Sequence, residues 1–453
     1  MRIGARFVAV AVCAALAGCV MAPGDQKPVV SNSASAAPVG PARLITGGAK
    51  LKSEEVGWET SADPYAYQDI RPGTRPAQKS DEAGLWMVMD GMERQLRTAG
   101  NRITDPALNE YIQGIVCKLA GPYCPDIRTY VVRAPHFNAT MMGNGTMQVW
   151  SGLLLRCRNE AQLATVLGHE IGHYIRRHSI QGMHDRVAKA DFLIFLQIGL
   201  AASGLPPGVY NIAELVAMGG VYAFGRDHER EADLIGITLL ARHGYDAREA
   251  PKIWAQLQQE MKANKDYSAG SLFYASHPPQ EEREATLTRL AEKLQPATDK
   301  FAKNRDQYLA AIGPWRNGFL ADELRLGKFK TSQELLKMLY ADGFKTSEVR
   351  FYQGELHRLR GKTPKAEKNE DLLSFLGAKK DAPERNDFEV ALEYYEKALK
   401  EPDPAPVIYR SIGLAQQRLG NDDAAREALK TYLSLAKNPK DRSIIEFMIK
   451  QSS

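Results

Sequence analysis

The sequence lacks a long uninterrupted apolar run and a strong excess of charge of one sign. Its longest clean apolar stretch, residues 192–202, is too short to cross a bilayer. The formal net charge of the 453-residue chain is only +5, and removal of Arg2 and Arg6 with an N-terminal leader would lower it by two. Such a small charge gives no electrostatic reason to expect binding to nucleic acid. We therefore expect neither an internal membrane span nor a nucleic-acid partner.

The composition is that of a folded chain. Hydrophobic residues make up 44% and charged residues 25% of the sequence, which excludes a disordered or collagen-like protein. A chain of 453 residues is too long for one ordinary hydrophobic core, because single cores stop growing well below this size. We expect two or three structural units.

The N-terminal residues resemble a bacterial lipoprotein signal. Arg2 and Arg6 form a basic start, residues 7–17 are apolar, and small residues precede Cys19. The resemblance implies a leader at residues 1–18 and lipidation of Cys19, which would anchor the chain to a membrane. Val20 stands where an Asp would retain enterobacterial lipoproteins in the inner membrane, so the outer membrane is favoured, although this rule differs between bacteria. The alternative is an ordinary secretory leader with a chance cysteine.

Cysteine is scarce, with 5 residues in the whole chain. After a leader with Cys13 is removed and Cys19 is lipidated, Cys117, Cys124 and Cys157 remain in a compartment that permits disulfides. An odd number leaves at least one thiol free. Cys117 and Cys124 either pair across a short loop or stay as two buried thiols.

Residues 19–80 are rich in proline, glycine, serine and alanine without an apolar period, which predicts a flexible tether. Helical spacing follows at residues 86–96 and 105–119. The period then changes to that of strands at residues 129–133 and 147–150, separated by turn residues that include the hairpin signal Gly143-Asn144-Gly145.

Two further helices carry polar motifs. Asn159 begins a helix whose apolar face predicts that it runs to about His178. Residues 192–224 are strongly apolar but interrupted by Pro206, Pro207 and Glu214, which favours buried helices over a mobile flap or a membrane-dipping loop. The next helix spans about residues 228–243.

The first of these helices contains the motif HExxH. His169 and His173, four residues apart, lie about 40° apart on a helix and can direct two imidazoles at one metal ion. Glu170 between them can reach a water molecule on that metal. The spacing suits zinc, so we expect one Zn²⁺ per chain with Glu170 as the general base.

A zinc hydrolase needs a third protein ligand and an open position for water. Glu229 and Asp233 share one face of the second helix, where Ala232 and Gly236 would allow close approach to the first helix. Glu229 is therefore the expected third ligand, and Asp233 the acceptor that fixes an imidazole of the pair. His228 and Glu231 are competing ligands.

These motifs resemble those of the zinc peptidases of metallopeptidase family forty-eight, which share HExxH on one helix and ExxxD on a later one. The resemblance covers about residues 81–290 and includes Asn138-Ala139, residues 147–154, and Ser276-His277-Pro278 with Arg283. It implies an α+β fold: a mainly helical zincin-type metalloprotease domain with a small β-sheet, at residues 81–295. In some members the histidine that matches His277 acts as a fourth zinc ligand and closes the site. The resemblance thus makes His277 a candidate switch and makes His277 and Arg283 candidate helpers at the substrate carbonyl; the alternative for His277 is a turn cap before Pro278.

Residues 296–453 have helical spacing throughout and a weak internal period. Leu326-Gly327 and Arg360-Gly361 each close a helical run and are 34 residues apart, the period of tetratricopeptide repeats. We expect an all-α, tetratricopeptide-like repeat region here, with an undistinguished helical bundle as the alternative. His136, His178, His184, His243 and His357 have no ligand spacing to the first pair and are expected to be structural.

The expected activity is zinc-dependent endoproteolysis in the bacterial envelope. The strand at residues 147–150 is expected to pair with an extended substrate, which would favour unfolded or misassembled envelope proteins. The repeats would recruit outer-membrane assembly machinery. The alternatives are a chaperone-like scaffold with a latent protease site, against which the intact Glu170 argues, and an exopeptidase.

Overall fold

The fold is taken from a computed structural model that describes residues 69–187, 225–263, 277, 282–295, 300–362 and 385–451. The predicted leader, Cys19, most of the predicted tether and the apolar segment 192–224 lie outside the described residues. Near the start of the described residues, Ile70 is packed into the fold: it is 5% exposed, and its carbonyl accepts a hydrogen bond from Tyr123. No helix in the described residues is long and apolar enough to cross a membrane.

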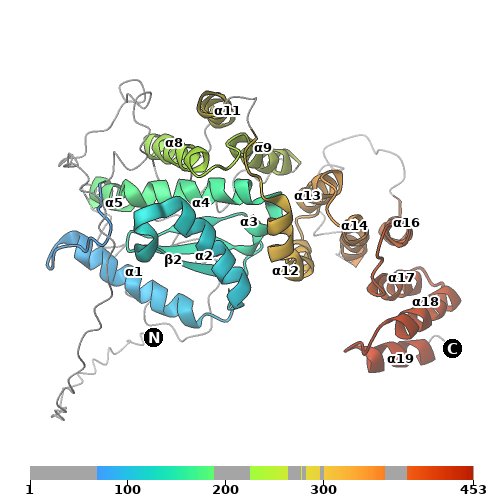
Figure 1. Ribbon diagram of the computed structural model, residues 1–453. Helices are drawn as coiled ribbons and strands as arrows, with labels where there is room; N and C mark the ends of the chain where they lie inside the picture. Colours follow the sequence, from blue (N-terminus) through green and yellow to red (C-terminus); the bar gives the residue numbers. More distant parts are fainter. Residues whose placement is uncertain are drawn as a thin grey trace, which may run out of the picture. The chain divides into compact units, whose positions relative to one another are not determined.

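A small mixed sheet lies beneath the helix that carries HExxH (Figure 1). Its strand order is β1-β2-β4-β3, from β1 (Arg102–Ile103), β2 (Arg128–Val132), β4 (Thr146–Trp150) and β3 (Ala139–Met141). The predicted turn at residues 143–145 does form a hairpin, but its first strand is β3, which the sequence analysis missed. The two strands that were predicted, β2 and β4, pair in parallel. A chain that returns through β3 can place these two strands side by side in the same direction.

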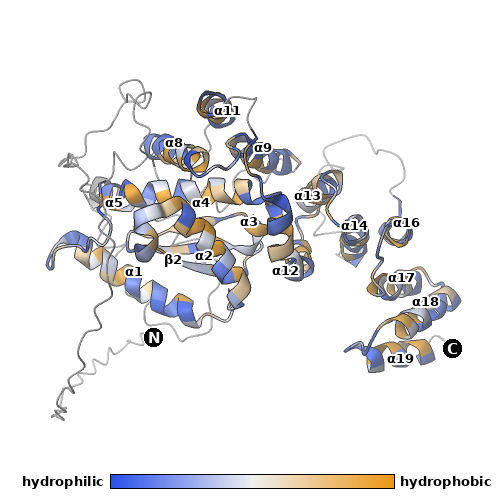
Figure 2. Cartoon of the chain, viewed as in Figure 1, coloured by the Kyte–Doolittle hydropathy of each residue, from blue (hydrophilic) through white to orange (hydrophobic). Residues whose placement is uncertain are grey.

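Helices surround this sheet. The helices of this part of the chain are α1 (Asp81–Thr98), α2 (Pro106–Ala120), the 3-10 helix η1 (Gly121–Asp126), α3 (Ser151–Arg156), α4 (Glu160–Ile175), α5 (His178–Val187), α8 (Arg226–Arg242), α9 (Glu249–Lys262) and α11 (Arg283–Leu294). Asp105 and Asn159 cap α2 and α4, each accepting a hydrogen bond from a backbone N–H. Every residue of α4 is buried, and Figure 2 shows this helix mainly white and orange, in keeping with its place in the core.

Helix α4 ends three residues before the predicted end. Arg177 takes a left-handed conformation with φ 53°, so the chain turns there and α5 begins at His178. The prediction that one helix runs to His178 is therefore wrong. The break changes the direction in which the side chain of His178 points relative to α4.

Glycines let α4 and α8 approach closely, as the sequence predicted. A Cβ atom added at Gly236 would lie 2.9 Å from the backbone nitrogen of His169, and one added at Gly172 would lie 3.1 Å from the Cα of Ala232. No side chain fits at either contact without a backbone shift. The contact fixes the distance between the two helices that carry the polar motifs.

This contact predicts the effect of Gly236→Ala. The added methyl group forces α8 away from α4, which we expect to lower the free energy of unfolding by about 1–3 kcal/mol. The matched control is Gly114→Ala in α2, where an added Cβ meets nothing within 4 Å and where alanine should instead stabilise the helix by about 0.5–1 kcal/mol. Denaturant unfolding of both variants measures the difference. Equal effects of the two substitutions would contradict the close contact.

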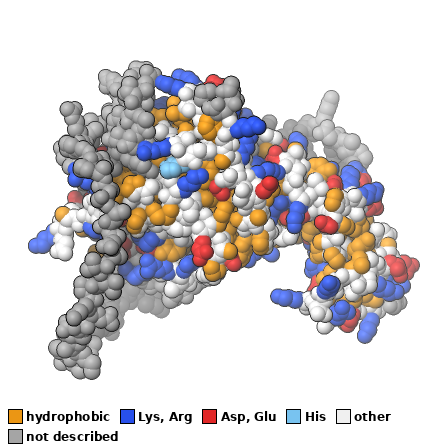
Figure 3. All heavy atoms as spheres, viewed as in Figure 1, with side chains coloured by type: hydrophobic (Ala, Val, Ile, Leu, Met, Phe, Trp, Pro, Cys, Tyr) orange, Lys and Arg blue, Asp and Glu red, His pale blue; other side chains and the backbone are white. Residues whose placement is uncertain are grey.

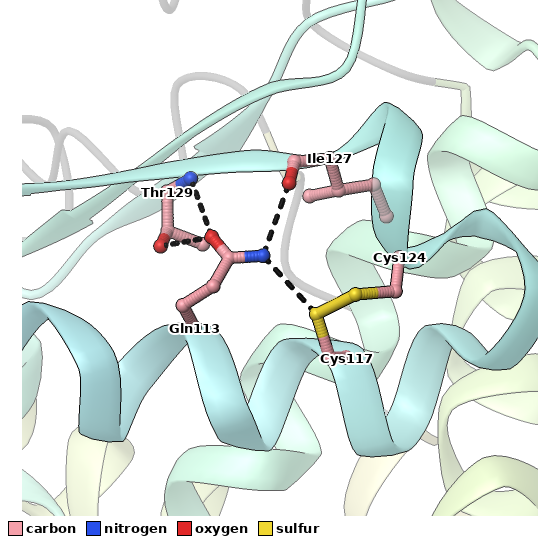
Figure 4. The surroundings of a disulfide bond; sticks show 5 residues. All are labelled: Gln113, Cys117, Cys124, Ile127 and Thr129. Atoms are coloured by element: carbon pink, nitrogen blue, oxygen red, sulfur yellow. Dashed lines mark hydrogen bonds between the residues drawn. A yellow bond between two sulfur atoms is a disulfide. The ribbon is translucent and has the colours of Figure 1, made fainter. Parts of the chain in front are cut away.

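Cys117 and Cys124 form a disulfide, which settles the alternative left open by the sequence, while Cys157 is free and buried. The bridge joins the last turn of α2 to η1 (Figure 4). Gln113 lies beside it and holds the start of β2: its Oε1 accepts hydrogen bonds from the backbone and hydroxyl of Thr129, and its Nε2 donates to the carbonyl of Ile127. The disulfide and this amide together fix α2 against the sheet.

The C-terminal part is helical, as predicted. Its helices are α12 (Arg305–Arg325), α13 (Phe329–Ala341), α14 (Thr346–Lys362), α16 (Asp387–Leu399), α17 (Val407–Arg418), α18 (Asp422–Leu435) and α19 (Arg442–Gln451). Neighbours along the chain pack on one another, most extensively α14 with α16 and α17 with α18. Residues of α12, α13 and α14, among them Tyr308, Leu335 and Leu356, belong to the same hydrophobic cluster as α4. The first three of these helices therefore continue the core that begins with α2 and the sheet.

A buried ion network joins α3 to this helical part. Arg156 lies between two carboxylates, with its Nε 2.9 Å from Glu260 and its Nη2 2.9 Å from Glu323. The three side chains are 5%, 2% and 2% exposed, so water solvates them poorly. Glu260 lies on α9 and Glu323 on α12. One guanidinium thus links three helices that are distant in the sequence.

On the surface of the molecule, Figure 3 shows basic and acidic side chains interspersed with apolar ones over the visible face.

Glu249 at the start of α9 supports the N-terminus of α4. Its Oε2 accepts hydrogen bonds from Asn159 and Gln162, and its Oε1 pairs with Lys252 and Lys303. Although burial alone would raise it, these partners lower the pKa of Glu249 to about 2. Because the folded pKa lies below the unfolded value of about 4.3, the ionised form stabilises the fold above pH ~4 and this contribution disappears as the pH falls toward 2.

We therefore expect Glu249→Gln to lower stability by about 1–3 kcal/mol at neutral pH. The difference from the unmutated chain should shrink steadily as the pH falls from about 5 to about 2. Denaturant unfolding at a series of pH values measures it. A difference that is independent of pH would show that the charge of Glu249 contributes nothing.

Candidate metal centre

Four buried side chains from three segments meet at one point. His169 and His173 come from α4, Glu229 comes from α8, and His277 precedes α11. One ligand atom from each lies within 4.8 Å of the others, and none of the four residues is more than 2% exposed. The structure thus brings together the three expected ligands and the candidate switch.

The ring of His169 is held by a carboxylate. Its Nδ1 lies 2.8 Å from Oδ1 of Asp233, and the same oxygen is 2.5 Å from Nη2 of Arg283. A carboxylate only accepts, so the shorter contact, to Asp233, places the proton of His169 on Nδ1 and the lone pair on Nε2, which lies in the cluster; Nη2 of Arg283 is 3.1 Å from the same Nδ1. Asp233 and Arg283 therefore orient His169, in the arrangement that the sequence predicted for Asp233.

The ring of His173 is held differently. Its Nδ1 lies 2.8 Å from Nδ1 of His178, whose Nε2 is 2.9 Å from Oε2 of Glu231. His178 was expected to be structural because a continuous helix would place it about 140° from His173. The break at Arg177 brings His178 behind His173, although His178 is not one of the four cluster residues. No periodicity in the sequence could have revealed this contact, because it depends on the end of α4.

The four-residue cluster has the donor set of a cation site. Nε2 of His169 and Nε2 of His173 lie only 3.1 Å apart, with both Nδ1 atoms occupied by other partners. Oε2 of Glu229 lies 3.5 Å from the first nitrogen, and Oε1 lies 3.3 Å from the second. Oε2 of Glu229 is buried and accepts no hydrogen bond. Two converging imidazole lone pairs and a buried carboxylate fit a divalent transition metal.

Glu170 lies beside the cluster and is 1% exposed. Burial raises the pKa of Glu170 to about 7, although the neighbouring His277 opposes the rise. Its Oε1 is 3.4 Å from Nε2 of His277 and accepts no hydrogen bond. A buried carboxyl group whose pKa lies near neutrality can both accept and return a proton.

His277 is the fourth member of the cluster. Its Nδ1 lies 2.9 Å from Oε1 of Glu229 and 3.3 Å from Nε2 of His169. Burial opposes its protonation, but the charges of Glu229 and Glu170 raise the pKa of His277. His277 therefore places a fourth possible ligand atom in the cluster.

Arg283 and Trp254 pack on each other beside His169. The guanidinium carbon of Arg283 lies 3.8 Å from the ring centre of Trp254, which in turn contacts the ring of His169 at 6.2 Å between centroids. Sequence reasoning did not single out Trp254. A guanidinium that stacks on this ring and pairs with Asp233 has little freedom to move.

The competing ligands lie outside the four-residue cluster. Glu231 is paired with His178 and Arg176, and the ring of His228 stacks on that of His178 at 4.3 Å. Among the other histidines, His357 is hydrogen bonded to Asp387, and His136 and His243 are likewise absent from the cluster. The side chain of His184 is outside the described residues.

Strand β4 cannot pair with a substrate as predicted. It is hydrogen bonded to β2 along its whole length and to β3 from Met147 to Val149. The edge of the sheet on this side is β3, and a backbone hydrogen bond from Met141 of this strand reaches Glu170. An extended peptide that adds to the sheet near the cluster would therefore meet β3.

Comparison with known proteins identifies the family in which such a cluster occurs. Residues 102–291 match the model of peptidase family M48. The chain contains an M48 peptidase domain. The M48 match spans the sheet, both motif-bearing helices, His277 and Arg283, and so confirms the family resemblance drawn from HExxH and ExxxD.

Relatives of this M48 domain occur in bacteria and in mitochondria. The chain is 28% identical over 237 residues to a beta-barrel assembly-enhancing protease of Escherichia coli, covering 50% of this chain and 47% of that protein. It is 30% identical over 196 residues to a protein of the same name from Yersinia pestis, covering 41% and 38%. It is 37% identical over 127 residues to the mitochondrial metalloendopeptidase OMA1 of Arabidopsis thaliana, covering 28% and 25%. The chain thus spans less than half the length of each of these relatives.

Proposed function

We propose that the protein is a zinc-dependent endopeptidase of the bacterial envelope. The observation that carries this proposal is the buried cluster of His169, His173, Glu229 and His277 beside Glu170, within an M48 domain. The donor set of two imidazoles and one carboxylate is that of catalytic zinc sites. A bound zinc ion would supply Lewis acidity, which polarises the substrate carbonyl and makes water a nucleophile at neutral pH.

The protein groups have separate tasks in this reaction. His169, His173 and Glu229 hold the metal, and Asp233 keeps the proton of His169 on Nδ1. Glu170 takes a proton from the attacking water and delivers it to the leaving amine, for which a pKa near neutrality is suited. Arg283 and His277 would stabilise the oxyanion as it develops on the substrate carbonyl.

His277 would also act as a latch. It lies within hydrogen-bonding distance of Glu229 and His169, so a substrate that reaches the metal has to displace it. A resting enzyme closed in this way would cleave little until a substrate arrives.

The substrate class proposed is unfolded or misassembled envelope protein. An extended peptide that adds to the outer edge of β3 forms mainly backbone hydrogen bonds, which depend little on sequence. The names of the bacterial relatives link such proteases to β-barrel assembly, which supports a role near the outer membrane. Lipidation of Cys19 would hold the chain there.

The helices from α12 onward are proposed to recruit partners. Sequential packing of helix pairs is the arrangement of tetratricopeptide repeats, and in the proposed role this region contacts outer-membrane assembly machinery. A chaperone-like scaffold with a latent protease site is the alternative function, which the buried contacts of His277 favour.

The test is metal content and cleavage of an unfolded model protein. We expect the full chain to bind one zinc ion, to cleave reduced, unfolded casein, and to lose this activity when zinc is chelated and regain it when zinc is restored. His277→Ala should cleave faster than the unmutated chain if His277 is a latch. Zinc binding without cleavage by either protein would support the scaffold, and absence of zinc binding would refute the proposed metal site.

A further inference from the structure

A chain of hydrogen bonds runs from His173 away from the metal cluster. Nδ1 of His173 meets Nδ1 of His178 at 2.8 Å, and Nε2 of His178 meets Oε2 of Glu231 at 2.9 Å. The two histidines are 1% and 0% exposed. None of the roles proposed above uses His178 or Glu231.

Glu231, the last member of this hydrogen-bonded relay of His173, His178 and Glu231, decides which atoms in it donate and which accept. Glu231 pairs through Oε1 with Nε of Arg176 at 3.0 Å, and its carboxylate only accepts hydrogen bonds. Nε2 of His178 must then carry the proton of that ring. A histidine binds a metal as the neutral ring, and a neutral imidazole such as that of His178 or His173 holds a single proton.

Proton counting then fixes the tautomer of His173. With the proton of His178 on Nε2, Nδ1 of His178 is a lone pair and can only accept. The contact of 2.8 Å between the two Nδ1 atoms therefore requires that His173 donates from Nδ1. Nε2 of His173 is left with its lone pair toward Glu229, which is the form that can bind a metal.

The relay is also rigid. Arg176 bridges Glu231 and Asp69, with contacts of 3.0 Å to each carboxylate. The ring of His228 stacks on His178 at 4.3 Å with an interplanar angle of 19°. Residues from α8, the C-terminal cap of α4 and the segment before α1 thus hold His178 in one orientation.

The two histidines of the HExxH motif are therefore supported in unlike ways. A carboxylate, Asp233, orients His169 directly, whereas a second imidazole orients His173 and a carboxylate acts only through that imidazole. Resting on the metal site proposed above, we propose that His178 is a positioning residue that fixes the Nδ1–H tautomer of His173, and that Glu231 fixes the tautomer of His178.

The first experiment measures affinity for Zn²⁺ alone, by competition with a chromophoric chelator, in the full chain. His178→Ala removes the acceptor and should weaken zinc binding by about 10- to 100-fold. His178→Asn places an amide oxygen where Nδ1 stood, after the same number of bonds, and should recover most of that loss. Glu231→Ala should weaken binding in the same direction and serves if His178→Ala does not fold. His357→Ala, which removes another buried, carboxylate-bonded histidine far along the chain, should leave the affinity unchanged.

The second experiment reads the tautomer without metal. In metal-free chain labelled with ¹⁵N-histidine, we expect the proton of His173 on Nδ1, and we expect His178→Ala to shift part of the population to Nε2–H. Equal affinities of the Ala and Asn variants, or a proton on Nε2 of His173 in the unmutated chain, would overturn the proposal. If the unmutated chain binds no zinc, the proposed metal site fails, and the tautomer still decides whether the relay exists.

Discussion

Glu170→Gln is expected to abolish peptide cleavage while zinc stays bound. The substitution keeps the size of the side chain but removes the group that accepts and returns the proton, a loss of about 10²- to 10⁴-fold in kcat. Glu170 is buried beside the cluster but is not one of the ligands within it. Cleavage of unfolded casein and zinc content, measured on the same preparations, show the two effects separately.

The matched control for this variant is Glu160→Gln, at the start of the same helix. Glu160 is also buried, but it bonds to Tyr111, Tyr245 and Asn304 and not to the cluster. We expect its zinc content to be unchanged and its activity to follow only the fraction of folded protein. Cleavage by Glu170→Gln at the rate of the unmutated chain would exclude Glu170 as the general base.

Arg156→Met is expected to cause a large loss of stability, about 3–5 kcal/mol. The substitution leaves Glu260 and Glu323 buried without their shared counter-charge, although methionine fills much of the same volume. Burial raises the pKa of Glu260 even with Arg156 present, so these carboxylates depend on the guanidinium. Denaturant unfolding and proteolysis of the native chain measure the loss.

A compensating variant tests the electrostatic cause. Arg156→Met combined with Glu260→Gln and Glu323→Gln removes all three charges and should recover a large part of the stability, because no uncompensated charge stays buried. If the triple variant is no more stable than Arg156→Met alone, lost packing and not charge explains the effect. Because α3, α9 and α12 share this network, we also expect α12 to become more susceptible to protease in Arg156→Met.

Local sequence patterns were sufficient for much of the site. The spacing of His169 and His173 predicted two ligands on one helix, and the small residues Ala232 and Gly236 predicted the close approach of α8. Both are properties of single helices and of their faces, which a sequence displays directly. The family resemblance then supplied His277 and Arg283, which follow a segment with no recognisable pattern of its own.

Features that depend on chain direction or on distant pairing were not predictable in this way. Nothing near Arg177 marks the left-handed residue that ends α4, so the contact between His178 and His173 was not expected. The Gly143-Asn144-Gly145 turn was recognised, but the three-residue β3 is too short to show an alternating pattern, and the parallel pairing of β2 with β4 was missed.

Partners far apart in sequence present the same difficulty. Arg156 meets Glu260 and Glu323 across 104 and 167 residues, and no local rule connects them. Cys117 and Cys124 are close in sequence, yet pairing and two separate buried thiols were both compatible with their spacing. Only the turn at Gly121, where φ is 55°, brings them together.

Asp69, the first described residue, is bonded to the end of the helix that carries His169 and His173. The amide of Asp69 donates to the carbonyl of Ile175, and its carboxylate pairs with Arg176, immediately after the end of α4. His173 lies only two residues before Ile175. Tension applied to the chain ahead of Asp69 would therefore be transmitted to the end of the helix that carries HExxH, at Ile175 and Arg176.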